Sequence, residues 1–109
     1  MDNELKKFVE ACIAKGEAEE LGDSKTGNKQ YKVISKVYMA LKENNRITEL
    51  LVLLNHENPY VRLWAAGYTL QILDSRAESV LEELSLLRGL IGFNSKMTLS
   101  EWRKGNLKF

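Results

Sequence analysis

Few residues in this chain have the types and the spacing that catalysis or metal binding requires. His56 is the only histidine and Cys12 the only cysteine. Neither a pair of histidines for a metal ion nor a cysteine–histidine pair within one motif can therefore be built. We expect His56 to lie at the end of a helix, where an imidazole interacts with the helix dipole. We expect Cys12 to pack as a small apolar side chain.

The acidic pairs and the glycines give no stronger signal for chemistry. Glu19–Glu20 and Glu82–Glu83 are sequence neighbours, and neighbours on a helix diverge by about 100° instead of converging on a substrate. Gly89 and Gly92 lack the lysine and the strand-to-helix context of a phosphate-binding loop. We therefore predict that the protein is not an enzyme and has no catalytic residue, no cofactor and no metal ligand.

The charges are segregated along the chain, although the net charge is only +1. Acidic blocks at 1–23 and 47–94 alternate with basic blocks at 24–46 and 95–109. These blocks are either solvated helix faces or a polarised surface that steers a charged partner. Within the block 24–46, four lysines lie along one edge of the predicted helix, with two tyrosines nearby: Lys25, Lys29, Lys32 and Lys36, and Tyr31 and Tyr38. This lysine edge could contact phosphates. A nearly neutral chain gains little from counterion release, however, so nucleic acid is not the expected partner.

Length and composition are those of one ordinary globular domain. A chain of 109 residues with 44% hydrophobic and 28% charged residues supports a single domain over 1–109. A single cysteine forms no internal disulfide and favours a reducing compartment. The start is acidic and polar, unlike a signal peptide, and no apolar run is long enough to span a bilayer. We expect a cytoplasmic protein without a membrane segment.

Apolar residues recur at the 3.6-residue period through most of the chain, and no segment alternates with period two, so an all-α fold is predicted. Gly22–Ser24 and Asn44–Asn45 interrupt the pattern. Residues 88–93 are interpreted as an apolar loop punctuated by glycines. The predicted helices cover about 3–21, 28–44, 46–56, 59–73, 76–87 and, after the capping-box spacing of Thr98 and Glu101, 99–104.

The segments 46–56 and 59–73 form the clearest unit. Asn58 can cap the second helix, and Pro59 suits its first turn. Small residues at 65–67 let two helices approach closely. We therefore predict an antiparallel helix hairpin here, and about three such pairs stacked into an α-α superhelix with a continuous core.

The motif Asn58-Pro59-x-Val61-Arg62-x-x-Ala65-Ala66-x-x-Leu70 resembles the second-helix signature of HEAT repeats. The resemblance implies that Val61, Ala65 and Leu70 pack inward and that Arg62 makes a hydrogen bond at the turn. It also implies a HEAT-like, armadillo-type architecture.

A longer resemblance covers nearly the whole chain. Four segments are similar to a small bacterial family catalogued as domain of unknown function twenty-nineteen: Gly22-Asp23-x-Lys25-x-x-Asn28, Val61–Ala66, Val80–Leu84 and Thr98-Leu99-x-Glu101-Trp102-Arg103-x-Gly105-x-Leu107. The family implies a HEAT-like fold and no settled biochemistry. Small helical-repeat families of this kind resemble immunity proteins that neutralise bacterial toxins.

We therefore predict a protein-binding module, most concretely a bacterial immunity protein that covers the active site of a cognate toxin domain, for instance a nuclease. A nuclease groove is basic, so acidic side chains are the natural contacts. Trp102 either caps the last helix pair or anchors the partner. The alternatives are an adaptor or scaffold without a toxin partner, or a nucleic-acid-associated module that uses the lysine edge. The predicted partner-binding residues are Glu17, Glu19, Glu20, Glu78, Glu82, Glu83, Trp102 and Arg103.

Overall fold

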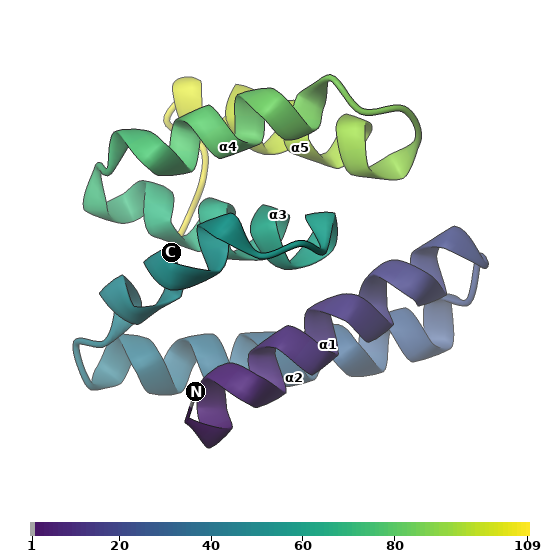
Figure 1. Ribbon diagram of the computed structural model, residues 1–109, viewed down its shortest axis with the longest axis horizontal. Helices are drawn as coiled ribbons and strands as arrows, with labels where there is room; N and C mark the ends of the chain where they lie inside the picture. The colour runs from purple at the N-terminus through teal and green to yellow at the C-terminus, as the bar shows by residue number, and fades with distance from the viewer. Residues whose placement is uncertain (1) are drawn as a thin grey trace. The chain divides into compact units, whose positions relative to one another are not determined.

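The structure is a computed structural model, and it describes residues 2–109 (Figure 1). Those residues form helices and no strand, which confirms the predicted all-α class. They divide into two compact units, one ending at Ile47 and the other covering Thr48–Phe109. The elements are α1 (Asn3–Glu20), α2 (Ser24–Glu43), the 3₁₀ helix η1 (Ile47–Asn55), α3 (Pro59–Thr69), the 3₁₀ turn η2 (Leu70–Ile72), α4 (Ser75–Ser85) and α5 (Leu90–Arg103).

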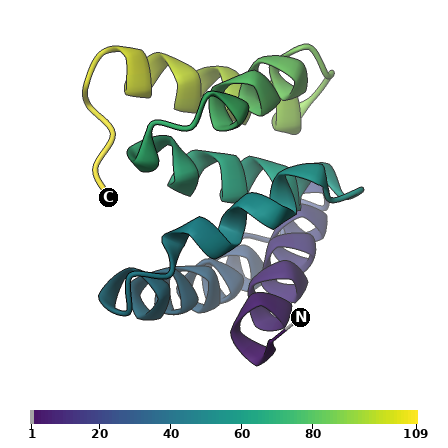
Figure 2. The same cartoon turned by 60° about the vertical axis from the view of Figure 1, so that its left-hand side comes forward.

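In the first unit, α1 and α2 run antiparallel and pack along their length, as Figures 1 and 2 show. The apolar periods predicted from the sequence point inward: Phe8 and Cys12 of α1 and Ile34 of α2 are fully buried. The two helices also approach where both carry small side chains. A Cβ atom added at Gly27 would lie 4.0 Å from the Cβ of Ala18.

Three of the helices begin at an aspartate whose carboxylate accepts a backbone N–H of the first turn. Asp2 accepts from Leu5 at 2.9 Å, Asp23 from Thr26 at 3.1 Å, and Asp74 from Arg76 at 2.9 Å. Because Asp23 caps the second helix, that helix begins at Ser24 and not at the predicted position 28. Asp74 likewise caps α4, which therefore begins at Ser75.

The first unit is closed by Arg46. The chain leaves α2 through Asn45, which adopts a left-handed conformation with φ of 56°, where the sequence predicts a break. Arg46 follows and donates hydrogen bonds to the carboxylates of Glu4 and Asp2 at the start of α1. The end of α2 is thereby tied to the beginning of α1.

In the second unit, α3 packs against α4 and α5, and α4 and α5 form an antiparallel pair (Figure 1). The side chain of Asn58 accepts the N–H groups of Tyr60 and Val61, and Pro59 occupies the first turn of α3 as predicted. The core of this unit includes the fully buried Leu81 of α4.

The segment before α3 differs in type from the prediction. Residues 47–55 form a 3₁₀ helix, not an α-helix. A 3₁₀ helix has three residues per turn, so residues spaced by three align on one side. Ile47, Leu50 and Leu53 have this spacing and are buried. Of the two leucines that fit only the 3.6-residue period, Leu54 is also buried, but Leu51 is only half-buried.

The prediction for the last part of the chain was wrong. The expected loop at 88–93 and short helix at 99–104 are replaced by one helix, α5, from Leu90 to Arg103. Gly89, with φ of 81°, turns the chain so sharply that the helix begins at the next residue. Thr98, expected as an N-cap, lies inside the helix and donates its hydroxyl to the carbonyl of Asn94 at 2.9 Å.

Candidate functional site

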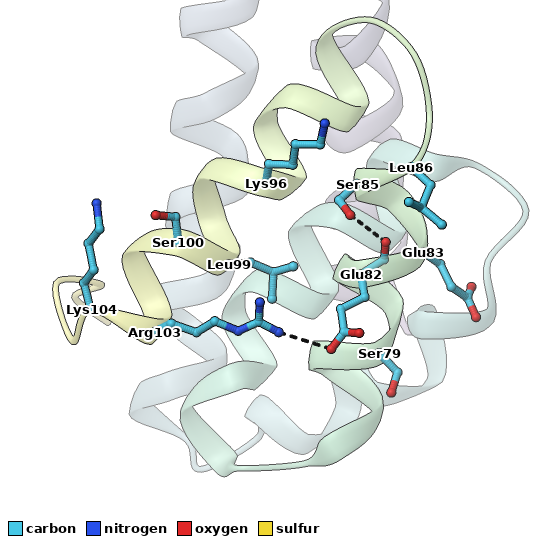
Figure 3. A pocket seen from close by; sticks show the side chains of 10 residues that line it. All are labelled: Ser79, Glu82, Glu83, Ser85, Leu86, Lys96, Leu99, Ser100, Arg103 and Lys104. Carbon is cyan, nitrogen blue, oxygen red and sulfur yellow. Dashed lines mark hydrogen bonds and ion pairs between the residues drawn. The ribbon is translucent and has the colours of Figure 1, made fainter.

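An open groove of about 890 Å³ lies between α4 and α5 in the second unit (Figure 3). The helices that form it are held together by the buried side chains of Leu81 and Leu84 on α4 and Leu99 on α5. Of these, Leu99 also lines the groove. The remaining lining residues are Ser79, Glu82, Glu83, Ser85, Leu86, Lys96, Ser100, Arg103 and Lys104.

Arg103 joins the two helices across this groove. Its Nη2 atom donates to Oε2 of Glu78 at 2.9 Å and to Oε1 of Glu82 at 3.2 Å. Glu78 and Glu82 are four residues apart on α4, so both face the same side of that helix. The hydrogen bond to Glu78, followed by the attraction of both carboxylates, raises the pKa of the Arg103 guanidinium. The Arg103 side chain is 53% exposed, so the cluster is open to a partner.

The two walls of the groove carry opposite charges. The α4 wall presents Glu82 and Glu83, and the α5 side presents Lys96 and Arg103, with Lys104 just beyond the helix (Figure 3). Arg103 neutralises part of the acidic wall, whereas Glu83 is exposed. The surface is therefore polar and mixed in sign, and not uniformly acidic.

A row of exposed apolar side chains adjoins the groove. Leu90, Phe93 and Met97 are spaced by three and four residues, so they share one side of α5. They are 41%, 60% and 47% exposed. Leu86 and Leu87, which precede the helix, are also exposed, and Leu86 lines the groove. We call Leu86, Leu87, Leu90, Phe93 and Met97 the apolar stripe.

The structure brings together half of the predicted partner-binding residues. Glu78, Glu82, Glu83 and Arg103 gather at the α4–α5 groove, because α4 and α5 are antiparallel neighbours. Trp102 lies beside Arg103 in sequence but is half-buried, and its ring meets that of Phe109 edge to face at 6.1 Å.

The other predicted partner-binding residues belong to the first unit. Glu17, Glu19 and Glu20 lie in the last turns of α1. Glu19 forms an ion pair with Lys15 at 2.6 Å, one turn earlier on the same helix. Glu17 and Glu20 are exposed.

Sequence reasoning missed the apolar stripe, because residues 88–93 were interpreted as a loop. The spacing of Leu90, Phe93 and Met97 was the available signal. It is a helical period, but Gly89 directly before it and Gly92 within it are typical of a loop.

The single histidine and the single cysteine have structural surroundings. Nδ1 of His56 accepts the backbone N–H of Asn58 at 3.0 Å, in the turn before α3. Cys12 is fully buried, and burial raises the pKa of its thiol. Among residues 2–109, no three histidine, cysteine or carboxylate side chains lie close enough to hold a metal ion. Nor is any helix formed by these residues both long enough and apolar enough to cross a membrane.

The HEAT-like motif of α3 is matched in its packing but not in its polar contact. Val61, Ala65 and Leu70 are buried, as the resemblance implies. The Nε atom of Arg62, however, is buried and has no hydrogen-bond partner among the described residues.

Comparison with known proteins places the chain in a family. The model of the family described as Domain of unknown function (DUF2019) matches residues 2–100, so the chain belongs to that family. The comparison with curated proteins finds no significant match. Among solved structures, the crystal structure of the protein RPA1889 from Rhodopseudomonas palustris CGA009 is similar, with a TM-score of 0.88 and 23% identity. The match covers 98% of this chain and 91% of that chain, and it establishes a shared fold.

Proposed function

We propose that this chain is a protein-binding module and that its binding surface is formed by the α4–α5 groove together with the apolar stripe. One observation carries the proposal: Leu90, Phe93 and Met97 are exposed on one side of α5, and Phe93 and Met97 each precede by three residues, about one helical turn, a residue that lines the groove, Lys96 and Ser100. An apolar centre bordered by polar and charged residues is the usual anatomy of a protein–protein interface.

Energetic arguments favour Phe93 as the anchor. Removing an aromatic ring from water is among the largest single contributions that one residue makes to an interface. Phe93 is 60% exposed, so most of its ring remains available for burial by a partner. The ion-paired Arg103 offers donors that are already oriented by Glu78 and Glu82, which lowers the entropy cost of using them in recognition.

The more specific proposal concerns the partner. We propose that the partner is a bacterial toxin domain in the cytoplasm, and that the chain neutralises it as an immunity protein, without catalysis. The mechanism is steric: the preformed α4–α5 surface covers the toxin's active site. Glu83 is the acidic residue of the groove best suited to a basic nuclease cleft, because Glu78 and Glu82 are already paired with Arg103.

Site-specific photo-crosslinking tests the surface and the partner together. A photoreactive phenylalanine analogue is placed at position 93 in the native host, and a matched control carries it at position 52. Val52 is 66% exposed and belongs to the same unit, but it lies on η1, away from the stripe and the groove in sequence. The expected result is one cross-linked protein from position 93 and none from position 52.

The identity of the cross-linked protein separates the two levels of the proposal. If it is a toxin whose lethality the chain suppresses on co-expression, the immunity function is supported. A cross-linked protein without toxicity would favour the adaptor or scaffold alternative. Cross-linking from position 52 alone would contradict the assignment of the binding surface.

A further inference from the structure

Helix α2 carries a straight row of exposed lysines in the first unit. Lys25, Lys29, Lys32 and Lys36 are separated by four, three and four residues, and all four are exposed. Because an α-helix has 3.6 residues per turn, this spacing places the four ammonium groups on one side of the helix, over about 16 Å. We call these four residues the lysine ridge.

The ridge lies on the outer side of α2. The buried residues of this helix include Gly27, Ile34 and Leu41, which are likewise separated by seven residues and therefore share a side. Ile34 is nine residues from Lys25, that is, two and a half turns, so the buried side is opposite the ridge. The packing of α1 on α2 thus leaves the ridge fully presented.

Among residues 2–109, no ion pair neutralises the charges of the ridge. Two other cations of the first unit have acidic partners: Lys15 pairs with Glu19, and Arg46 with Glu4 and Asp2. No carboxylate among residues 2–109 is in ion-pair contact with the four lysines of the ridge. Like charges at this spacing repel one another and destabilise the helix slightly. An anionic ligand would relieve this repulsion.

The composition of the ridge indicates which polyanion it fits. Protein–protein interfaces are depleted in lysine and depend on apolar or aromatic anchors, and the ridge itself contains only lysines. Reading of base edges relies mainly on side chains with two fixed hydrogen-bonding groups, such as arginine, asparagine and glutamine, which the ridge also lacks. Lysines in a row are instead suited to successive phosphates, which they contact as point charges.

We propose that the lysine ridge of α2 binds the phosphodiester backbone of a nucleic acid without sequence preference. The net charge of +1 does not argue against this, because the balancing acidic residues do not pair with the ridge. The proposal is independent of the α4–α5 surface, since the ridge belongs to the first unit and the groove to the second. Variants of one therefore leave the other intact.

Fluorescence anisotropy with a labelled DNA duplex and a labelled single-stranded RNA tests the proposal. Four phosphate contacts predict that the logarithm of the association constant falls with the logarithm of salt concentration with a slope of about −3 to −4 on the duplex. The variant Lys29→Gln/Lys32→Gln should weaken binding about tenfold at low salt and reduce the slope by about 2. Binding to the single-stranded RNA should show a shallower dependence on salt concentration than binding to the duplex, because each phosphate of a single strand releases fewer counterions.

A matched control variant has the same net charge as the Lys29→Gln/Lys32→Gln variant. Lys6 and Lys7 are exposed lysines of α1 in the same unit, so Lys6→Gln/Lys7→Gln removes two charges without touching the ridge. This variant should bind within about twofold of the original chain, and circular dichroism checks that both variants are folded. Equal weakening by both double variants, or no salt-dependent binding to either nucleic acid, would overturn the proposal. Binding to polyglutamate alone would assign the ridge to an acidic protein.

Discussion

Arg103 is the residue that organises the candidate binding surface. One guanidinium lies between two carboxylates that are four residues apart on α4, and without it Glu78 and Glu82 would repel each other. The Arg103 guanidinium donates to both carboxylates, and the neighbouring Glu83 remains exposed. The ion pairs bridge α4 and α5 at the surface, whereas the buried leucines hold the two helices together.

Gly92 is a position at which the fold has no room for a side chain. A Cβ atom at this position would lie 1.8 Å from the carbonyl oxygen of Leu87, which is backbone and has little freedom to move. We predict that Gly92→Ala lowers the free energy of unfolding by about 2 kcal/mol or more, because the start of α5 must shift. Urea unfolding followed by circular dichroism measures this loss.

Gly67 provides the control for this prediction. A Cβ atom there would meet only Cγ2 of Thr98, at an ordinary contact distance of 3.8 Å. Gly67→Ala should therefore be neutral or stabilising by up to about 1 kcal/mol, since alanine favours the helix. Gly92→Ala with unchanged stability would show that the turn before α5 is built differently.

Cys12 should be chemically silent in the folded protein. Its side chain is fully buried in the first unit, and burial raises the pKa of its thiol, so little thiolate forms at neutral pH. We predict no reaction with a thiol-specific disulfide reagent in native buffer and one full equivalent of reaction in denaturant. Rapid reaction of the native protein would show that the first unit opens readily.

At the scale of the helices, capping residues and apolar periods were predicted well where they agree with each other. Asn58 and Pro59 mark the start of α3 in the sequence, and the structure uses them in that way. The period of α1 also predicts its buried side. In these elements, local signals are strong enough to determine the helix without tertiary information.

The helices that sequence reasoning misjudged are those in which one local signal opposes another. In α5, Gly89 and Gly92 suggest a loop, whereas Leu90, Phe93 and Met97 follow a helical period. Gly92 is needed because Leu87 packs against it, and no sequence pattern announces that contact. In η1, the leucines are spaced by both three and four residues, so their spacing alone does not distinguish a 3₁₀ helix from an α-helix.

The residues of the candidate site could be predicted only where the helices that carry them were predicted correctly. Glu78, Glu82, Glu83 and Arg103 were named from their charge, but their convergence depends on the antiparallel pairing of α4 with α5. The apolar stripe followed from the helical state of residues 90–97 and was missed together with it.

The aspartate caps make the helices sensitive to acid. The pKa of Asp74 is lowered from 3.8 to about 2, first by the hydrogen bond from the Arg76 side chain. The pKa of Asp2 is lowered by the N–H of Leu5, and that of Asp23 by the hydrogen bond from Thr26. A lowered pKa in the folded state contributes stability above the unfolded value, and this contribution is lost as the pH falls toward the folded value.

We therefore predict that stability falls between about pH 4 and pH 2, and that Asp2→Asn/Asp23→Asn/Asp74→Asn reduces this fall. Asparagine caps a helix as well as aspartate does, but it does not titrate. Urea midpoints at neutral pH and across the acidic window measure the difference. An unchanged acid dependence in the triple variant would assign the effect to other carboxylates.

For the whole molecule, the near-neutral net charge conceals two different surfaces. The second unit carries a mixed-charge groove beside an apolar stripe, and the first unit carries the unpaired lysine ridge. Their chemistry fits two kinds of ligand, a protein for the first surface and a polyanion for the second. The two can therefore be tested separately in one intact chain.

The most direct test of the central claim uses the partner protein that the cross-linking experiment identifies, purified in its free form. Its affinity for two surface variants of this chain is measured. Phe93→Asp and Val52→Asp each place a charge on an exposed apolar position of the second unit. If the α4–α5 surface binds the partner, isothermal titration calorimetry should show Phe93→Asp weakening binding tenfold or more, about 1.4 kcal/mol, while Val52→Asp stays within about twofold. Unchanged affinity of Phe93→Asp, or a larger loss in Val52→Asp, would contradict the account.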